Sequence, residues 1–177
     1  MRIIAGSRKG HTIFAPPGRD TRPTSDRVRE NTFNLIGPVE DASVLDLFAG
    51  SGALGLEALS RGAASAVFVE SDRDAVSAIE RNLDKLRLTG ATVLRRDALQ
   101  ALAGEASAGR KYDLVLLDPP YDRYEKMQPT LARYLPSVLA EDGLVVFESG
   151  ARTEPELPLQ IRTSRKYGNA RVTLFEH

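Results

Sequence analysis

The stretch Val44-Leu-Asp-Leu-Phe-Ala-Gly-Ser-Gly-Ala-Leu-Gly-Leu-Glu57 decides the fold of this chain. Its first residues are largely apolar and predict a buried strand over residues 44–48. The glycines then predict a tight turn, and a helical pattern begins at Ala53. Strand, glycine turn and helix open a nucleotide-binding α/β domain, because glycine lets the backbone approach a ligand and the helix N-terminus offers unpaired N–H groups.

The turn by itself leaves the ligand open. Gly50-x-Gly52-x-x-Gly55 fits the fingerprint of dinucleotide sites, and Glu70 follows at about the 20-residue spacing of that fingerprint's ribose-binding acid. Asp46, however, places a carboxylate directly before the glycines, where it would repel a pyrophosphate and attract a cation. S-adenosylmethionine carries a sulfonium and an ammonium and no phosphate. We therefore favour S-adenosylmethionine over NAD, and over a turn that binds nothing.

Composition limits the remaining classes. The chain has 177 residues, of which 42% are hydrophobic and 27% charged, as expected for one globular domain. It has no cysteine, which excludes disulfides, thiolate metal sites and a thiol nucleophile. No apolar run is long enough to cross a membrane, and the N-terminus lacks a signal-peptide pattern. We expect a cytoplasmic monomer without a metal ion or a membrane partner.

The formal net charge of zero conceals an uneven distribution. Residues 1–30 hold seven Lys or Arg against three Asp or Glu, and residues 161–177 hold four against one. Residues 31–160 hold thirteen against twenty. Basic ends on an acidic middle suggest that both ends meet an anion such as a nucleic acid backbone, although solvated termini are an alternative.

Arginine and lysine at the N-terminal end supply candidate phosphate contacts. Residues 2–5 and 11–15 predict the two strands of a hairpin, with two cations at the tip of the turn between them. Three possible N-caps, Thr24, Ser25 and Asp26, predict the start of a helix that runs to about Ile36, with arginines on or near the side opposite its apolar stripe. Ordinary solvated surfaces carry the same residues, so that alternative stays open. The candidates are Arg8, Lys9, Arg22, Arg27 and Arg29.

The rest of the chain alternates strands with helices and ends in a hairpin. Residues 99–110 are weakly patterned and predict a loop. This order predicts a mostly parallel sheet with one antiparallel strand. The expected strands after the first are residues 66–71, 91–98, 112–117, 144–149, 160–166 and 170–176. Expected helices begin near residues 53 and 74, and a further helix carries Met127, Leu131, Leu135, Val138 and Leu139 up to Gly143.

Four acids each close an expected strand: Asp46, Glu70, Asp97 and Asp118. Ligands of open parallel sheets bind outside the carboxyl ends of the strands, so these acids should line one edge. Glu70 could accept both ribose hydroxyls of an adenosine. Asp97 could accept an adenine amino group, or it could cap the segment that follows.

Asp118-Pro-Pro-Tyr121 follows a buried strand and suits methylation of an amine on a nucleic acid base. Such an amine is a poor nucleophile because its lone pair is delocalised into the ring. The Asp118 carboxylate can accept one N–H and the Pro119 carbonyl the other, which directs the lone pair toward a sulfonium methyl group. Tyr121 offers a ring on which the base can stack. A rigid turn that leaves a strand is the structural alternative.

At these residues the chain resembles the class I S-adenosylmethionine methyltransferases that act on amines. It is most similar to the bacterial 16S rRNA (guanine(966)-N(2))-methyltransferase family, the small-subunit RNA methyltransferase D type. The resemblance covers nearly the whole chain, and residues 99–111 and the short C-terminus are not diagnostic. It rests on residues 2–6, Lys9-Gly10, Arg22–Asn34, Leu45–Gly62, Asp118–Tyr121 and Lys166–Gly168.

The resemblance implies methylation of a guanine N2 amine in the 16S rRNA of the small ribosomal subunit. It implies a single Rossmann-like class I methyltransferase domain over residues 37–177, with a seven-stranded sheet and an antiparallel C-terminal strand. Residues 1–36 would form a small RNA-facing extension of hairpin and helix. The implied cofactor-binding residues are Asp46, Phe48, Ala49, Gly50, Ser51, Gly52, Glu70, Ser71, Asp97 and Ala98, and the implied catalytic residues are Asp118, Pro119, Pro120 and Tyr121.

Three other functions remain open from the sequence. A DNA adenine-N6 methyltransferase, or another methyltransferase acting on an exocyclic amine, would use the same chemistry, but 177 residues leave no separate target-recognition domain. An NAD-dependent oxidoreductase would leave Asp46 and Asp118-Pro-Pro-Tyr121 without a role. A non-catalytic RNA-binding module would leave the whole set of acids without one.

Overall fold

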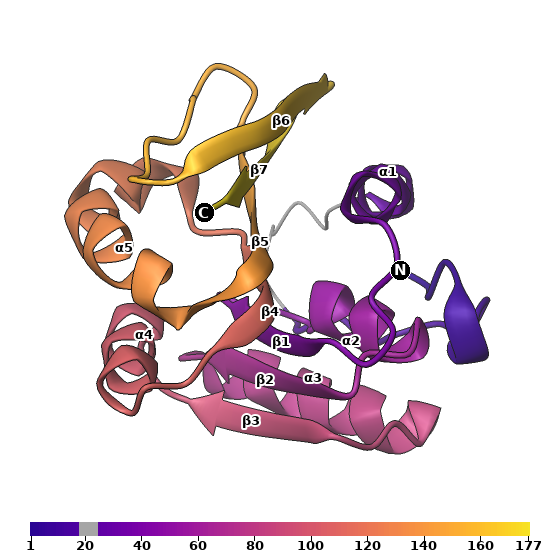
Figure 1. The fold of residues 1–177 in the computed structure, drawn as a ribbon. Helices are drawn as coiled ribbons and strands as arrows, with labels where there is room; N and C mark the ends of the chain where they lie inside the picture. Colours follow the sequence, from indigo (N-terminus) through magenta and orange to yellow (C-terminus); the bar gives the residue numbers. More distant parts are fainter. Residues whose placement is uncertain (18–24) are drawn as a thin grey trace.

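A seven-stranded sheet forms the centre of the protein in a computed structural model that describes residues 1–17 and 25–177 (Figure 1). Its strand order is β3-β2-β1-β4-β5-β7-β6. The strands are β1 (Ser43–Leu47), β2 (Ser65–Glu70), β3 (Ala91–Arg95), β4 (Tyr112–Leu117), β5 (Leu139–Gly150), β6 (Gln160–Tyr167) and β7 (Ala170–Glu176). Strands β1 to β5 pair in parallel, and β7 pairs antiparallel with both β5 and β6. The predicted mostly parallel sheet with an antiparallel C-terminal strand is confirmed.

Helices cover both faces of the sheet, as Figure 1 shows. Helices α1, α2 and α3 lie on one side, and α4 and α5 lie on the other. Their bounds are α1 (Asp26–Ile36), α2 (Ala53–Ser60), α3 (Arg73–Leu86), α4 (Ala98–Ser107) and α5 (Tyr124–Val138), with short 3₁₀ helices at Gly6–Arg8 and Tyr121–Arg123. No helix among the described residues is long and apolar enough to cross a membrane.

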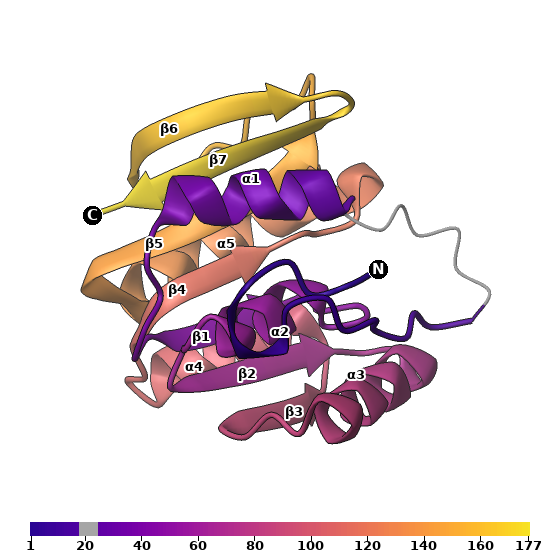
Figure 2. The same cartoon turned by 90° about the vertical axis from the view of Figure 1, so that its right-hand side faces the viewer.

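Two clusters of buried side chains pack against the two faces. Successive side chains on a strand point to opposite faces of the sheet. Leu116 and Val146 therefore belong to the cluster that packs against α1, α2 and α3, whereas Leu117 and Phe147 belong to the cluster that packs against α4 and α5. The first cluster also contains Phe33 from the N-terminal part of the chain. Residues before β1 therefore share the core of the sheet, and Figure 2 shows α1 lying across it. The division of the chain near residue 36 stays a prediction.

The N-terminal segment pairs with itself less than the hairpin prediction requires. Its ladder is a single bridge between Arg2 and Thr12, flanked by backbone hydrogen bonds such as Ile3 N–H to His11 O at 2.9 Å. The N–H groups of Ile4 and Ala5 instead donate to the Glu57 carboxylate on α2, at 2.9 and 3.0 Å. The prediction of two regular strands was therefore wrong. The N–H groups of Ile4 and Ala5 donate to the buried Glu57 carboxylate and not to a partner strand.

The loop predicted over residues 99–110 was also wrong. Helix α4 begins after Asp97, whose side chain accepts the N–H of Gln100 at 3.0 Å. Ala98, Ala101, Leu102 and Glu105 are buried, which is the spacing of one helix face. Small alanines made this face hard to recognise by hydrophobicity.

Candidate functional site

The turn between β1 and α2 has an unusual backbone and an open side. Phe48, Gly50 and Gly52 have positive φ angles of 60°, 57° and 81°. A non-glycine residue at such an angle is strained, and strain of this kind gathers at functional sites. A Cβ atom built on Gly50 would meet nothing within 4 Å, whereas one on Gly52 would lie 3.2 Å from Ile79. The turn is thus packed underneath and has room beside Gly50 for a ligand.

Gly55 sets the distance between α2 and the sheet. A Cβ atom there would lie 2.4 Å from Cε1 of Phe68 and 3.0 Å from Oδ2 of Asp46. Phe68 is fully buried in β2 and has little room to move. The third glycine therefore brings the helix N-terminus close to the strands, and this closeness lets Asp46 reach it.

Asp46 is a buried carboxyl group beneath the turn. It is 2% exposed, and its Oδ2 accepts the backbone N–H of Gly55 at 3.0 Å. Burial raises the pKa of Asp46 to about 7, the Gly55 N–H opposes the rise, and the negative charge of Glu70 adds to it. A cationic ligand would stabilise the ionised form of Asp46 beside the negative charge of Glu70.

This arrangement also bears on the dinucleotide alternative. In a dinucleotide site the first-turn N–H groups of the helix face the pyrophosphate. Here the N–H of Gly55, in the first turn of α2, donates to Asp46 instead. The carboxylate thus occupies the position of an anion, so the site fits the positively charged methionine part of S-adenosylmethionine and not a pyrophosphate.

Glu70, the last residue of β2, holds the same turn from the other side. Its Oε2 accepts the N–H of Gly50 at 2.8 Å, and its Oε1 accepts the N–H of Asp72 at 3.0 Å. A carboxylate has about four acceptor sites, so these two hydrogen bonds are compatible with a contact to a ligand's hydroxyl groups. Ser71, the next residue, is exposed. Glu70 therefore shapes the turn, and its role in holding a ribose stays a prediction.

Asp97 lies two residues beyond the end of β3, on the exposed surface. It caps α4, which is the structural alternative considered for it, and Ala98 is the first residue of the helix. The cap uses Oδ1. Because the other oxygen takes no part in this bond, a contact with adenine stays compatible with the cap.

Asp118 to Tyr121 leave the sheet where β4 ends, beside the turn of the neighbouring strand β1. Pro119 is buried, whereas the Tyr121 side chain is 45% exposed. A Cβ atom built on Gly150, the last residue of β5, would lie 3.8 Å from the Tyr121 ring. The aromatic ring thus stands next to the end of β5, where a flat base could stack on it.

The four predicted acids do lie at one edge of the sheet. Parallel pairing of β3, β2, β1 and β4 brings Asp97, Glu70, Asp46 and Asp118 to the carboxyl ends of adjacent strands. Among the described residues no group of three or more His, Cys, Asp or Glu could hold a metal ion. The edge is therefore an acidic rim around a strained glycine turn.

The candidate RNA-contacting residues have very different environments. Lys9 and Arg27 are exposed. Arg8 donates from its guanidinium to the backbone oxygens of Leu86 and Arg87, at the C-terminal end of α3, and is only partly exposed. Arg22 lies outside the described residues.

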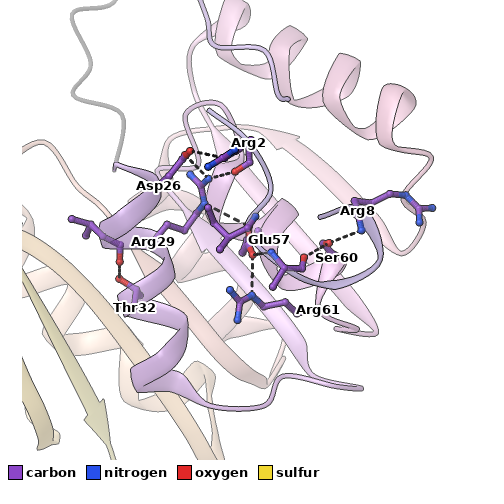
Figure 3. Close-up of polar contacts among 12 residues, drawn as sticks. Arg2, Arg8, Asp26, Arg29, Thr32, Glu57, Ser60 and Arg61 are labelled. Atoms are coloured by element: carbon purple, nitrogen blue, oxygen red, sulfur yellow. Dashed lines mark hydrogen bonds and ion pairs between the residues drawn. The ribbon is translucent and has the colours of Figure 1, made fainter. Parts of the chain in front are cut away.

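Arg29 contradicts the predicted exposed side of α1, because it is fully buried. Its guanidinium pairs with Asp26 at 3.0 Å and with Glu57 at 3.6 Å, and it donates to the backbone oxygen of Arg2 (Figure 3). The helix places residue 29 toward α2, one turn from Phe33, which is buried on the same side. Contact with RNA through Arg29 was therefore a wrong prediction.

Glu57 is a residue whose importance the sequence did not reveal. It is fully buried in α2 and accepts hydrogen bonds from Ile4 N, Ala5 N and Arg61 Nε at 2.9 to 3.0 Å, beside its ion pair with Arg29 (Figure 3). Its carboxylate thereby joins the N-terminal segment and α1 to the helix that follows the glycine turn. A glutamate in the middle of an otherwise apolar helix was the available signal.

The chain is similar to known and putative rRNA methyltransferases over most of its length. The model of the family described as conserved hypothetical protein 95 matches residues 1–176. A putative rRNA methyltransferase of Bacillus subtilis, YlbH, is 42% identical over 184 residues, which cover 99% of this chain and 98% of that protein. The ribosomal RNA small subunit methyltransferase D of Escherichia coli is 45% identical over 124 residues, covering 70% of this chain and 61% of that protein.

The fold of the chain is also similar to that of a solved structure. The putative methyltransferase yhhF from Escherichia coli has a TM-score of 0.84 and 36% identity, and the match covers 100% of this chain and 97% of that one. The match includes the edge that carries the glycine turn and Asp118 to Tyr121. With a family match over residues 1–176 and these relatives, the chain belongs to the conserved hypothetical protein 95 family of methyltransferase-like proteins.

Proposed function

We propose that this protein transfers a methyl group from S-adenosylmethionine to the exocyclic N2 amine of a guanine in the 16S rRNA of the small ribosomal subunit. The observation that carries the proposal is the position of Asp118-Pro-Pro-Tyr121. This segment leaves β4 directly beside the strained glycine turn of β1. A methyl donor in the turn and an amine at Asp118 would therefore meet at one sheet edge.

The cofactor part rests on charge and space. The buried Asp46 and its neighbour Glu70 create a negative potential that a sulfonium and an ammonium would relieve. The open side of Gly50 gives room for the ligand. S-adenosylmethionine supplies an electrophilic methyl group when bound, and the chain's contribution is to hold it and to present the acceptor. Glu70 would hold the ribose, and Asp97 with Ala98 the adenine.

The acceptor part rests on Asp118 to Tyr121. The Asp118 carboxylate would accept a hydrogen bond from one N–H of the amine, and the Pro119 carbonyl would accept one from the other N–H. The base would stack on the half-exposed Tyr121 ring. Pro119 and Pro120 restrict the backbone, so these acceptors are aimed before the substrate arrives. The new N–CH₃ bond would form as the S–CH₃ bond breaks and leaves a neutral thioether, and the Asp118 carboxylate would accept the proton that the nitrogen loses. This transfer needs no enzyme nucleophile, which suits a chain without cysteine.

The choice of small-subunit rRNA is supported by the names of the relatives and by the charge distribution, whereas the choice of the guanine N2 amine follows from the resemblance to the 16S rRNA (guanine(966)-N(2))-methyltransferase family. The Escherichia coli relative is a ribosomal RNA small subunit methyltransferase D by name, and the Bacillus subtilis relative is a putative rRNA methyltransferase. The exposed Lys9 and Arg27 are described cations available to a phosphate backbone. An unpaired base in RNA can be splayed out and stacked without opening a long duplex.

The test is transfer of a labelled methyl group from S-adenosylmethionine to three substrates: small subunits that lack the modification, the same rRNA freed of protein, and duplex DNA. We expect label in N2-methylguanosine with the first substrate, and its loss in Asp118→Ala. Asp122→Ala, which removes an exposed carboxylate in the adjacent 3₁₀ helix, is the matched control and should retain activity. Label only in N6-methyladenine of DNA would overturn the substrate and leave the chemistry standing.

A further inference from the structure

A fifth carboxylate, Glu148, lies at the acidic edge and takes no part in the roles described so far. It is near the end of β5 and is 8% exposed. Strands β4 and β5 pair in parallel up to Leu117 and Phe147, so Asp118 and Glu148 are the next two neighbours in register. Adjacent strands are about 4.8 Å apart. Glu148 therefore lies one strand away from the carboxylate assigned to the target amine.

The two carboxylates also belong to the same face of the sheet. Leu116 and Val146 lie two residues before Asp118 and Glu148, and both belong to the buried cluster on the side of α1, α2 and α3. Side chains two residues apart on a strand point to the same face. By this alternation, Glu148 is directed toward the face on which Asp118 stands, and not toward α4 and α5.

The Tyr121 ring connects the end of β5 with the target site independently of this register. A Cβ atom on Gly150 would lie 3.8 Å from Cδ2 of Tyr121, so the ring rests against the residue that ends β5. A base stacked on Tyr121 would thus be bordered by β4 through Asp118 and by β5 through Glu148. The end of β5 forms a second wall of the proposed base site.

Guanine has a hydrogen-bond donor that a carboxylate at the end of β5 can recognise. Its Watson–Crick edge carries an N1–H donor next to the N2 amine, whereas the N1 of adenine is an acceptor without a hydrogen. An ionised carboxylate only accepts hydrogen bonds. We propose that Glu148 accepts the N1–H of the target guanine and selects guanine over bases with an unprotonated N1, an inference that rests on the proposed function.

The environment of Glu148 suits selection better than a solvated carboxylate would. A carboxylate oxygen next to an unprotonated N1 would bring two acceptors into contact, which is unfavourable, and at a buried position water does not separate them. Sites that bind a polar group in this way reject analogues that lack it far more strongly than apolar pockets reject a change of size. Glu148 already takes part in a polar interaction within the folded chain, and a carboxylate has about four acceptor sites, so it can accept a further bond.

The experiment compares guanine with 2-aminopurine at the target position of otherwise identical rRNA, assembled into small subunits. 2-Aminopurine keeps the 2-amino group and has an unprotonated N1. Methyl transfer is measured as kcat/KM for wild type, Glu148→Gln and Glu105→Gln. Glu105 is a buried glutamate of α4 on the opposite face and is the matched control. Differences in the intrinsic reactivity of the two bases cancel when the guanine to 2-aminopurine ratio is compared between variants.

We expect wild type and Glu105→Gln to share one ratio that favours guanine. The amide of Glu148→Gln can donate to an unprotonated N1, so its ratio should move toward 2-aminopurine by roughly tenfold, within the range of a specific base contact. A structural role of Glu148 would lower both rates together and leave the ratio unchanged, which would overturn the inference. Equal use of both bases by wild type would overturn it without any variant, even if Glu148→Gln did not fold.

The outcome also separates this inference from the proposed function. If wild type forms no N2-methylguanosine on any RNA substrate, the proposed function fails and the inference fails with it. If N2-methylguanosine forms and the ratio is the same in Glu148→Gln, only the role of Glu148 is wrong. Thermal unfolding of each variant checks that the compared proteins are folded.

Discussion

Replacing Asp46 by asparagine should stabilise the ligand-free protein, and increasingly so as the pH rises. Asparagine has the same shape, and its side-chain oxygen can still accept the N–H of Gly55. Burial raises the pKa of Asp46 from 3.8 to about 7. At about 1.4 kcal/mol per pKa unit, holding the ionised carboxylate in the fold costs about 4 kcal/mol.

The sign follows from proton linkage. Between pH 4 and pH 7 the folded protein keeps a proton on Asp46 that the unfolded chain has released, so wild type loses stability as the pH rises. The loss is absent below the unfolded pKa and complete above the folded pKa. For the cited values it amounts to about 2 kcal/mol at pH 5 and about 4 kcal/mol at pH 8. Asp46→Asn lacks this titration.

Urea unfolding of both ligand-free proteins at several pH values measures the difference. The free energy of unfolding of Asp46→Asn minus that of wild type should grow by about 2 kcal/mol between pH 5 and pH 8. All other titrating groups are shared and cancel. Asp84→Asn, at an exposed position of α3, controls for the substitution itself and should change stability by less than about 0.5 kcal/mol. A difference between wild type and Asp46→Asn that does not change with pH would refute the reasoning.

Three further predictions concern the same site and its support. The affinity of wild type for S-adenosylmethionine should increase by about fivefold from pH 6 to pH 7, because the ionised fraction of Asp46 rises through its pKa of about 7. Calorimetric titration that finds the same dependence in Asp46→Asn would contradict it. Gly55→Ala should lose about 1–3 kcal/mol of unfolding free energy, because its Cβ would overlap the buried Phe68 ring; a urea midpoint equal to that of wild type would show that the ring yields freely. Glu57→Gln should lower the free energy of unfolding by about 3–5 kcal/mol, because it removes the negative charge that pairs with the buried Arg29 guanidinium. Glu80→Gln, on the exposed side of α3, is the control and should be nearly neutral. Equal melting curves for the two variants would rule out the Glu57 network as a major source of stability.

Much of the cofactor edge was predictable because its signals are local. Short segments of sequence such as Leu45–Gly52 predict the glycine turn, the strand before it and the acid near the end of that strand. Parallel strands must end at the same edge, so the convergence of Asp46, Glu70 and Asp118 followed from strand order without any contact being known. The C-terminal hairpin was equally local, since Gly168 and Asn169 mark the turn between β6 and β7.

The errors occurred where a distant partner decides the outcome. The N-terminal segment has the pattern of a hairpin, but Glu57, more than fifty residues away, takes the N–H groups of Ile4 and Ala5. Arg29 has the type of residue that binds phosphate, yet it is buried against the same glutamate. The alanine-rich face of α4 was missed because its burial depends on how closely α5 and the sheet approach it.

The sequence by itself determined the order of most strands and helices, the glycine turn and the position of Asp118-Pro-Pro-Tyr121 after a buried strand, because these depend on backbone preferences and on periodicity over a few residues. Only the tertiary structure decided which charges are buried and which neighbours they have. Burial raises the pKa of Asp46 and hides Arg29, and the parallel pairing of β4 with β5 up to Leu117 and Phe147 makes Asp118 and Glu148 the next residues in register. The physical reason is that desolvation and pairing depend on atoms brought together from separate parts of the chain, and sequence spacing carries no measure of that distance.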